Sequence, residues 1–207
     1  MLNYKVIIWD FDGVIIFSNE VREGGFREIF RDHGDELIEK LLTFHRINGG
    51  LSRYVKIRYF YEDLLGRSIS DAEVKGLANE FSELMKTKLT NKALLNDDWL
   101  QFMIVGKGKY VHHIASGSDG NELRLLCSEL GISHFFETIN GSPTHKNKLV
   151  SDIIESNRYK KQEVILIGDS INDYEAARAN GISFRGYNND ELMDKGKYLK
   201  ELKDALA

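Results

Sequence analysis

The chain has 207 residues, enough for one domain with an insertion or for two small domains. Its composition, 42% hydrophobic and 29% charged, supports a buried core and a soluble surface, and the single proline argues against disordered linkers. The net charge of −4 gives no general attraction to nucleic acid or to anionic membranes, so we expect neither as a partner. The sequence makes no prediction about the oligomeric state.

The cysteine content and the N-terminus bear on the compartment. There is one cysteine, Cys127, so no intrachain disulfide can form, and it shares a helical stripe with leucines that favours a place in the core. The apolar N-terminus is interrupted by Asp10 and Asp12 and does not have the pattern of a signal peptide. No run reaches the ~20 apolar residues of a membrane-spanning helix. We therefore expect a cytoplasmic protein.

Short apolar runs rich in β-branched residues recur along the chain and predict buried strands. They lie at residues 5–9, 111–115, 138–139, 164–167 and, more weakly, 182–184. Continuous apolar runs of this kind are typical of parallel sheets, whose strands are buried on both faces. Helical stripes lie between the later runs. The alternation of strand and helix predicts an α/β fold with a parallel sheet.

The segment from residue 15 to residue 95 has several helical patterns and no convincing strand. Ser70 and Glu73 have the spacing of a capping box, and the helix that they open has apolar residues at core spacing. The sequence therefore predicts an α/β core and an all-helical unit inserted after the first strand. The predicted boundaries are 1–14 and 96–207 for the core and 15–95 for the helical insertion.

Four acidic side chains follow two of the predicted strands. Asp10 and Asp12, in Asp-Phe-Asp-Gly-Val, follow the first strand and point to the same side of an extended chain. Asp169 and Asp173, in Gly-Asp-Ser-Ile-Asn-Asp, follow the strand at 164–167, and either acid alone is equally explained as a helix cap. Loops after parallel strands meet at one edge of the sheet, so the four carboxylates should converge and repel one another. A divalent cation relieves that repulsion, and oxygen-only ligands favour Mg²⁺ over zinc.

Two further positions supply groups suited to phosphate. Ser116, followed by Gly117, comes after the second strand and offers a hydroxyl, and the helix that starts near Asp119 adds backbone amides. Lys146 stands at the start of the helix after the third strand, where Lys148 competes for the same role. The two lysines lie about 200° apart on a helix, so both cannot face the site. We favour Lys146 because it is nearer the strand end.

Together these motifs resemble those of the haloacid dehalogenase superfamily. The shared pattern is Asp-x-Asp-Gly-Val after the first strand, Ser-Gly after the second, a lysine that opens a helix, and Gly-Asp-x-x-x-Asp after a later strand, in that order. The resemblance spans about residues 4–186 and is strongest to phosphoglycolate-phosphatase-like and β-phosphoglucomutase-like members. It implies a Rossmann-like three-layer α/β/α core, with the helical insertion as a C1-type cap.

The resemblance implies a role for each matched residue. Asp10 matches the nucleophile that forms an aspartyl-phosphate, and Asp12 matches the general acid and base. The groups matched to the transferring phosphate are Ser116, Gly117, Lys146 and Asn172. The matched Mg²⁺ ligands are Asp10, the backbone carbonyl of Asp12, Asp169, and Asp173 acting directly or through water.

The implied activity is the magnesium-dependent hydrolysis of a small phosphate monoester, such as a sugar phosphate or a phosphorylated organic acid. Asp12 favours phosphate esters, because dehalogenases of the superfamily lack this second aspartate and phosphonate-cleaving members replace it with a small residue. A sugar phosphomutase uses the same two aspartates and stays open as an alternative. A non-catalytic binding protein on this fold also stays open, although the presence of both aspartates argues against it.

Arginines in the helical insertion are candidates for substrate recognition. Gly49 and Gly50 separate two helical patterns, and Arg46 and Arg53 flank them. Arginine can hold a carboxylate or a second phosphate through paired hydrogen bonds, while an ordinary solvated charge is the simpler interpretation. We expect Arg46 and Arg53 to contact the part of the substrate remote from the reacting phosphate.

Overall fold

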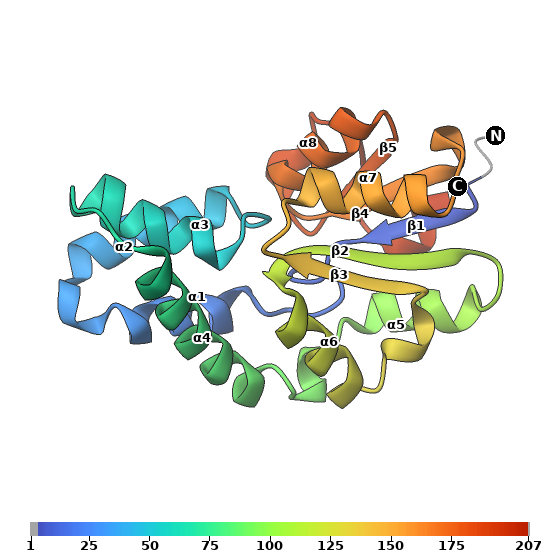
Figure 1. Cartoon of the computed structure of the whole chain (residues 1–207). Helices are drawn as coiled ribbons and strands as arrows, with labels where there is room; N and C mark the ends of the chain where they lie inside the picture. Colours follow the sequence, from blue (N-terminus) through green and yellow to red (C-terminus); the bar gives the residue numbers. More distant parts are fainter. Residues whose placement is uncertain (1–3, 207) are drawn as a thin grey trace.

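The computed structural model describes residues 4–206, and this part of the chain contains one six-stranded parallel sheet (Figure 1). The strand order is β3-β2-β1-β4-β5-β6. The strands are β1 (Val6–Trp9), β2 (Val111–Asp119), β3 (Thr138–Ser142), β4 (Val164–Gly168), β5 (Ser183–Tyr187) and β6 (Lys197–Leu199). The chain order reverses at β1, which pairs with β2 on one side and β4 on the other. In such sheets ligands bind outside the carboxyl ends of the strands at this point.

The predicted parallel α/β sheet is confirmed, with differences at the strand ends. β2 continues past Ala115 to Asp119, and its register with β3 shifts between these two residues. Ser116 and Gly117 therefore belong to the irregular end of a strand, whereas the sequence placed them in the loop after it. β6 was not predicted, because its three residues, Lys-Tyr-Leu, carry no apolar run.

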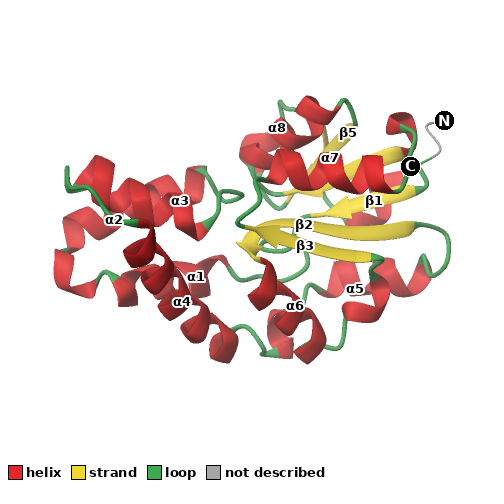
Figure 2. Cartoon of the chain, in the orientation of Figure 1, coloured by secondary structure: helices red, strands yellow, loops and turns green. Residues whose placement is uncertain are grey.

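Four core helices cover the two faces of the sheet (Figure 2). They are α5 (Asp97–Val105), α6 (Gly120–Glu129), α7 (Lys146–Ser156) and α8 (Ile171–Asn180). Successive side chains of β1 point to opposite faces: Val6 and Ile8 pack in the cluster with α7 and α8, and Ile7 and Trp9 pack in the cluster with α5 and α6. This arrangement is the expected three-layer α/β/α core.

A group of helices lies between β1 and α5 and stands to one side of the sheet (Figure 1). They are α1 (Asn19–Ile29), α2 (Asp35–Ile47), α3 (Arg53–Arg58) with its π-helical continuation Tyr59–Leu64, and α4 (Asp71–Lys88). The capping box predicted at the start of α4 is confirmed: Ser70 and Glu73 bond each other's backbone amides. The two connections to the core run side by side, because Ile16 and Leu95 form an antiparallel bridge. Short 3₁₀ turns occur at Arg31–His33, Lys92–Leu94, Ser133–Phe135, Lys161–Glu163, Asp190–Leu192 and Leu202–Leu206.

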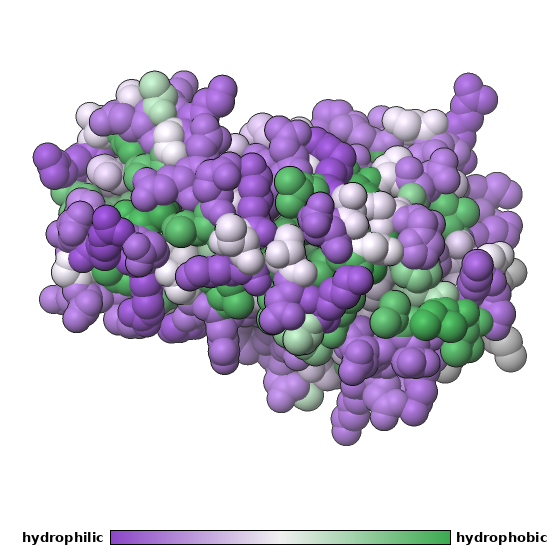
Figure 3. Space-filling view, turned by 90° about the horizontal axis from the view of Figure 1, so that it is seen from below, coloured by the Kyte–Doolittle hydropathy of each residue, from purple (hydrophilic) through white to green (hydrophobic). Residues whose placement is uncertain are grey.

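Hydrophilic residues cover most of the face seen in Figure 3, with small hydrophobic patches between them. Within residues 4–206 there is no helix whose length and hydropathy would suit it to crossing a bilayer. Cys127 is fully buried, in agreement with its expected place in the core.

Candidate active site

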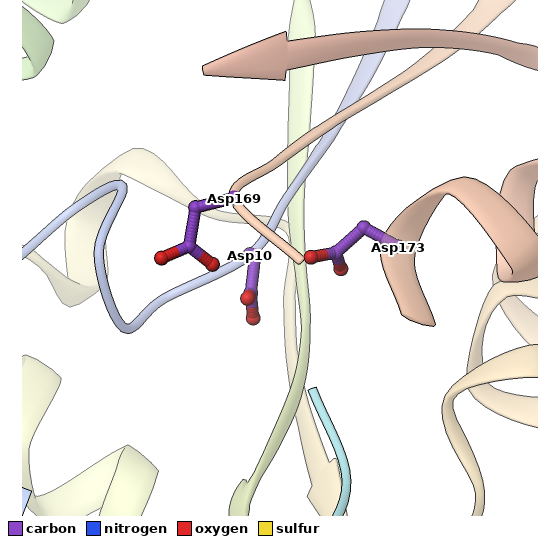
Figure 4. Close-up of side chains that lie close together, drawn as sticks. All are labelled: Asp10, Asp169 and Asp173. Atoms are coloured by element: carbon purple, nitrogen blue, oxygen red, sulfur yellow. The ribbon is translucent and has the colours of Figure 1, made fainter. Parts of the chain in front are cut away.

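Three carboxylates meet at the carboxyl edge of the sheet (Figure 4). Asp10 directly follows β1, Asp169 directly follows β4, and Asp173 lies in the first turn of α8. One oxygen atom of each lies within 4.8 Å of the others, which makes this a group that can hold a metal ion. Asp169 lies before α8 and Asp173 lies within it, so these two acids converge through a strand-to-helix turn.

Two glycines make this convergence possible. Gly13 has a φ of +75°, and a Cβ atom there would lie 1.8 Å from Oδ2 of Asp169. Gly168 ends β4, and a Cβ atom there would lie 2.3 Å from Cγ of Asp173. Any larger residue at either position would displace an acid of the cluster. The glycines of both motifs are therefore explained by close approach of the backbone to the carboxylates.

Lys146, the first residue of α7, is buried among these acids. Its Nζ lies 2.9 Å from Oδ1 of Asp10 and 2.5 Å from Oδ1 of Asp173. Lys148 is exposed and forms an ion pair with Asp152 on the surface. Of the two competing lysines, only Lys146 faces the carboxylates.

The protonation of the cluster follows from its burial and its excess of negative charge. Burial and the neighbouring Asp173 raise the pKa of Asp10 to about 7, against the lowering effect of Lys146. Burial and the charge of Asp10 also raise the pKa of Asp169 well above its usual range. Burial lowers the pKa of Lys146, but Asp10 and Asp173 outweigh it and raise that pKa. The cluster thus holds protons near neutral pH that a bound cation would displace.

The side chain of Asp12 lies outside this cluster and is held by its own set of donors. Its Oδ1 accepts from Arg22 Nε at 2.7 Å and from the Ser18 hydroxyl, and its Oδ2 accepts from Ser118 Oγ at 2.5 Å. Burial raises the pKa of Asp12, but Arg22 and the two hydroxyls outweigh it and lower that pKa to about 2. Asp12 is therefore an oriented, ionised carboxylate beside Asp10.

The other expected phosphate-binding groups surround the same edge. Ser116 is buried, and its Oγ accepts from the backbone N–H of Ser118 at 3.1 Å. Gly117 is covered by the helical insertion, since a Cβ atom there would lie 2.4 Å from the carbonyl oxygen of Gly50. Asn172 is buried in the first turn of α8, and its Oδ1 has no hydrogen-bond partner among the described residues.

A cavity of about 200 Å³ separates this edge from the helical insertion. Asp10, Asp12, Ser116 and Asp169 line its floor, and its wall includes both predicted arginines. The wall residues from the insertion are Asn19, Arg22, Glu23, Phe26, His45, Arg46, Gly49, Leu51, Arg53, Lys56 and Phe81.

The two predicted arginines are both paired with carboxylates. Arg46 is half exposed and donates to Glu23, with Nε 2.8 Å from Oε1. Arg53 is buried and makes a two-pronged contact with Glu122 of α6, at 2.6 Å and 2.9 Å. Their contact with a substrate stays a prediction.

The family model described as "Haloacid dehalogenase-like hydrolase" matches residues 7–186. The chain belongs to the haloacid dehalogenase-like hydrolase family. No curated protein matches it significantly.

Solved structures share the fold of this family member over nearly the whole chain. A β-phosphoglucomutase from Clostridium difficile has a TM-score of 0.78 at 18% identity, covering 96% of this chain and 91% of that one. A predicted phosphatase from Clostridium acetobutylicum has a TM-score of 0.78 at 16% identity, covering 98% and 96%. A predicted phosphoglycolate phosphatase from Haemophilus somnus has a TM-score of 0.73 at 16% identity, covering 98% and 96%.

Sequence reasoning missed a polar network that links this enzyme's core to its insertion. Arg22 of α1 binds both Asp12 and Glu122, and Glu122 in turn binds Arg53, which also donates to Ser82. Glu122 shows in the sequence only as an acid in the first turn of a predicted helix, where a solvated residue is the usual case. Its contacts come from elements that the fold alone brings together, so no spacing pattern could have indicated them.

Proposed function

We propose that the protein is a magnesium-dependent phosphatase that hydrolyses a small phosphate monoester through an aspartyl-phosphate on Asp10. The observation that carries the proposal is the placement of Asp10 beside two further carboxylates and a buried lysine at the carboxyl edge of the sheet. Family membership makes a hydrolase the expected class. The identity of the residues around Asp10 then favours phosphate transfer to a carboxylate nucleophile.

The donors present fit a hard divalent cation. The ligands would be Asp10, Asp169, Asp173 and the backbone carbonyl of Asp12, all of them oxygen donors of the kind that Mg²⁺ prefers. The raised pKa values of Asp10 and Asp169 mark a site with more negative charge than Lys146 balances. Bound Mg²⁺ would neutralise this charge and that of the phosphate oxygens.

The reaction has two steps on this arrangement. In the first, a carboxylate oxygen of Asp10 forms a bond to phosphorus as the ester P–O bond breaks, and the leaving oxygen takes a proton from Asp12. In the second, Asp12 takes a proton from water as the water oxygen attacks phosphorus, which releases inorganic phosphate and restores the Asp10 carboxylate. Asp12 must be protonated for the first step, and the donors around it in this structure favour its ionised form, the form needed for the second.

The remaining groups hold the transferring phosphoryl group. Lys146 supplies a buried positive charge, and Ser116, the Gly117 amide and the Asn172 side chain supply polar contacts around its oxygens. The helical insertion, residues 15–95, covers this site as a cap and provides the wall that meets the rest of the substrate. A cavity of this size suits a small sugar phosphate or phosphorylated organic acid.

A panel of phosphomonoesters tests the proposal. The protein should release inorganic phosphate from small esters in the presence of Mg²⁺ and lose this activity when a chelator is in excess. No bisphosphate activator should be needed. Isomerisation of a hexose 1-phosphate with little phosphate release would contradict the phosphatase assignment, and full activity in excess chelator would contradict the metal requirement.

A further inference from the structure

The cations of the cavity wall differ in what neutralises them. Arg46 is paired with Glu23, and Arg53 is paired with Glu122. Arg22 lies between Asp12 and Glu122 and contacts both. Each of these three arginines therefore already faces a carboxylate of the chain itself. An anionic substrate group would have to compete with that carboxylate.

Lys56 of α3 is a cation of the same wall with a different environment. Its side chain is buried, and no described carboxylate lies within ion-pair distance of its ammonium. The Nζ atom contacts His45 Nδ1 at 2.7 Å and donates to the carbonyl oxygen of Gly49 at 3.0 Å. Burial and the positive charge of Lys56 lower the pKa of His45 to about 2, so the imidazole is neutral and accepts at Nδ1.

A buried ammonium without a counter-ion is costly, and the cost falls when an anion arrives. Burial is the main reason that the pKa of Lys56 falls to about 7. Two of its three N–H groups have neutral partners, which leaves one for a ligand. Lys56 is thus arranged to gain more from a negatively charged oxygen than the arginines beside it.

Lys56 lies in the same cavity as the site expected for the reacting phosphate. Its partner Gly49 belongs to the turn between α2 and α3, and this turn lies against the core. A Cβ atom on Gly50 would lie 3.3 Å from Lys146 Nζ and 2.7 Å from Ser170 Oγ. Lys56 lines the same cavity as Asp10 and Ser116, and it comes from the helical insertion whereas they come from the core. A small substrate bound at Asp10 would therefore extend toward Lys56.

We propose that Lys56 is a specificity-determining residue that binds an acidic group of the substrate, a carboxylate or a second phosphate, at the end remote from the reacting phosphorus. This inference rests on the proposed phosphatase function and names its substrate class: phosphate monoesters that carry a second anionic group. The sequence pattern favours Arg53 for contact with this part of the substrate. We assign that contact to Lys56, because Arg53 is already ion-paired with Glu122.

Substrate pairs that differ in one acidic group test the proposal. The carboxylate pair is 2-phosphoglycolate and 2-hydroxyethyl phosphate, and the phosphate pair is a hexose 1,6-bisphosphate and the hexose 1-phosphate. For at least one pair, kcat/KM of the wild type should favour the acidic member about 30-fold or more, and the pair that does so identifies the acidic group. Lys56→Gln should reduce that ratio by about 30-fold, the effect of losing a hydrogen bond to a charged group worth about 2 kcal/mol.

The outcomes separate this proposal from the function on which it rests. The control Lys148→Gln removes an exposed lysine outside the cavity and should keep the wild-type ratio. A purely structural role for Lys56 would lower kcat/KM for both members alike, and that result would overturn the proposal. If the wild type hydrolyses the two members of each pair equally, that result would also overturn the proposal, whether or not the variant folds. Absence of phosphate release from every ester, including an aryl phosphate, would instead overturn the phosphatase assignment itself.

Discussion

The floor and the wall of the cavity differ in the sign of the charge that is left unbalanced. The floor includes Asp10 and Asp169, which belong with Asp173 to the carboxylate cluster around Lys146, and this cluster is left with excess negative charge. The wall gathers arginines that are matched by carboxylates such as Glu122, and one lysine, Lys56, that is not. The floor is suited to a cation and a phosphate whatever the rest of the substrate is, whereas the wall is suited to choosing among substrates. We therefore propose that chemistry and selectivity lie on different parts of the chain.

The largest expected effect is on the floor. Asp10→Asn should lower turnover of an activated aryl phosphate by several orders of magnitude, because the amide cannot act as the nucleophile. Circular dichroism should show an unchanged fold, since Asn is close to Asp in size and the excess charge at the floor becomes smaller. Near-normal turnover by a folded variant would show that Asp10 is not the nucleophile. The proposed division of roles between floor and wall would then fail as well.

A substitution in the network of charges behind the wall should lower the stability of the protein. Glu122→Gln leaves Arg53 and Arg22 without their shared buried carboxylate, and breaking a buried pair in this way costs about 3–5 kcal/mol. Urea denaturation should show a correspondingly lower free energy of unfolding. The matched control Lys148→Gln breaks an exposed ion pair with Asp152 and should leave the free energy of unfolding unchanged. Equal behaviour of the two variants would show that Glu122 does not tie the insertion to the core.

A smaller effect links pH, Mg²⁺ and the floor. The pKa of Asp10 is raised from 3.8 to about 7 by burial and by Asp173, so between these pH values the folded chain holds a proton that the unfolded chain releases. The contribution of Asp10 to the free energy of unfolding of the metal-free protein therefore falls as the pH rises through that window. Mg²⁺ needs the ionised carboxylate. Its apparent affinity should therefore increase by up to about tenfold for each unit that the pH rises toward 7.

Thermal unfolding with and without Mg²⁺ measures this linkage. The rise in Tm caused by Mg²⁺ should be larger at pH 8 than at pH 6, with NaCl of equal ionic strength as the control. An equal or larger rise at pH 6 would contradict a floor that exchanges protons for a cation.

The floor was largely predictable from the sequence and the wall was not, for a physical reason. Asp10 and Asp169 follow apolar runs that are long enough to identify as strands, and parallel strands bring their ends together by rule. The same rule places Lys146 at the site and Lys148 outside it. The contacts of Glu122 and Lys56 depend on how the helical insertion sits on the core, which no periodicity encodes. Likewise, β6 and the extended end of β2 have too few apolar residues to be predicted as strands from the sequence.

In the proposed mechanism Asp10 carries the phosphoryl group, and the most direct test is to detect the phosphoryl group on that residue. The protein should be mixed with Mg²⁺ and a substrate that it hydrolyses, quenched in acid within milliseconds, digested, and analysed by mass spectrometry. We predict that the peptide containing Asp10 gains the mass of one phosphoryl group in the wild type and that the corresponding peptide of Asp10→Asn does not. Phosphate release without any modified peptide, or with the phosphoryl group on another residue, would contradict it.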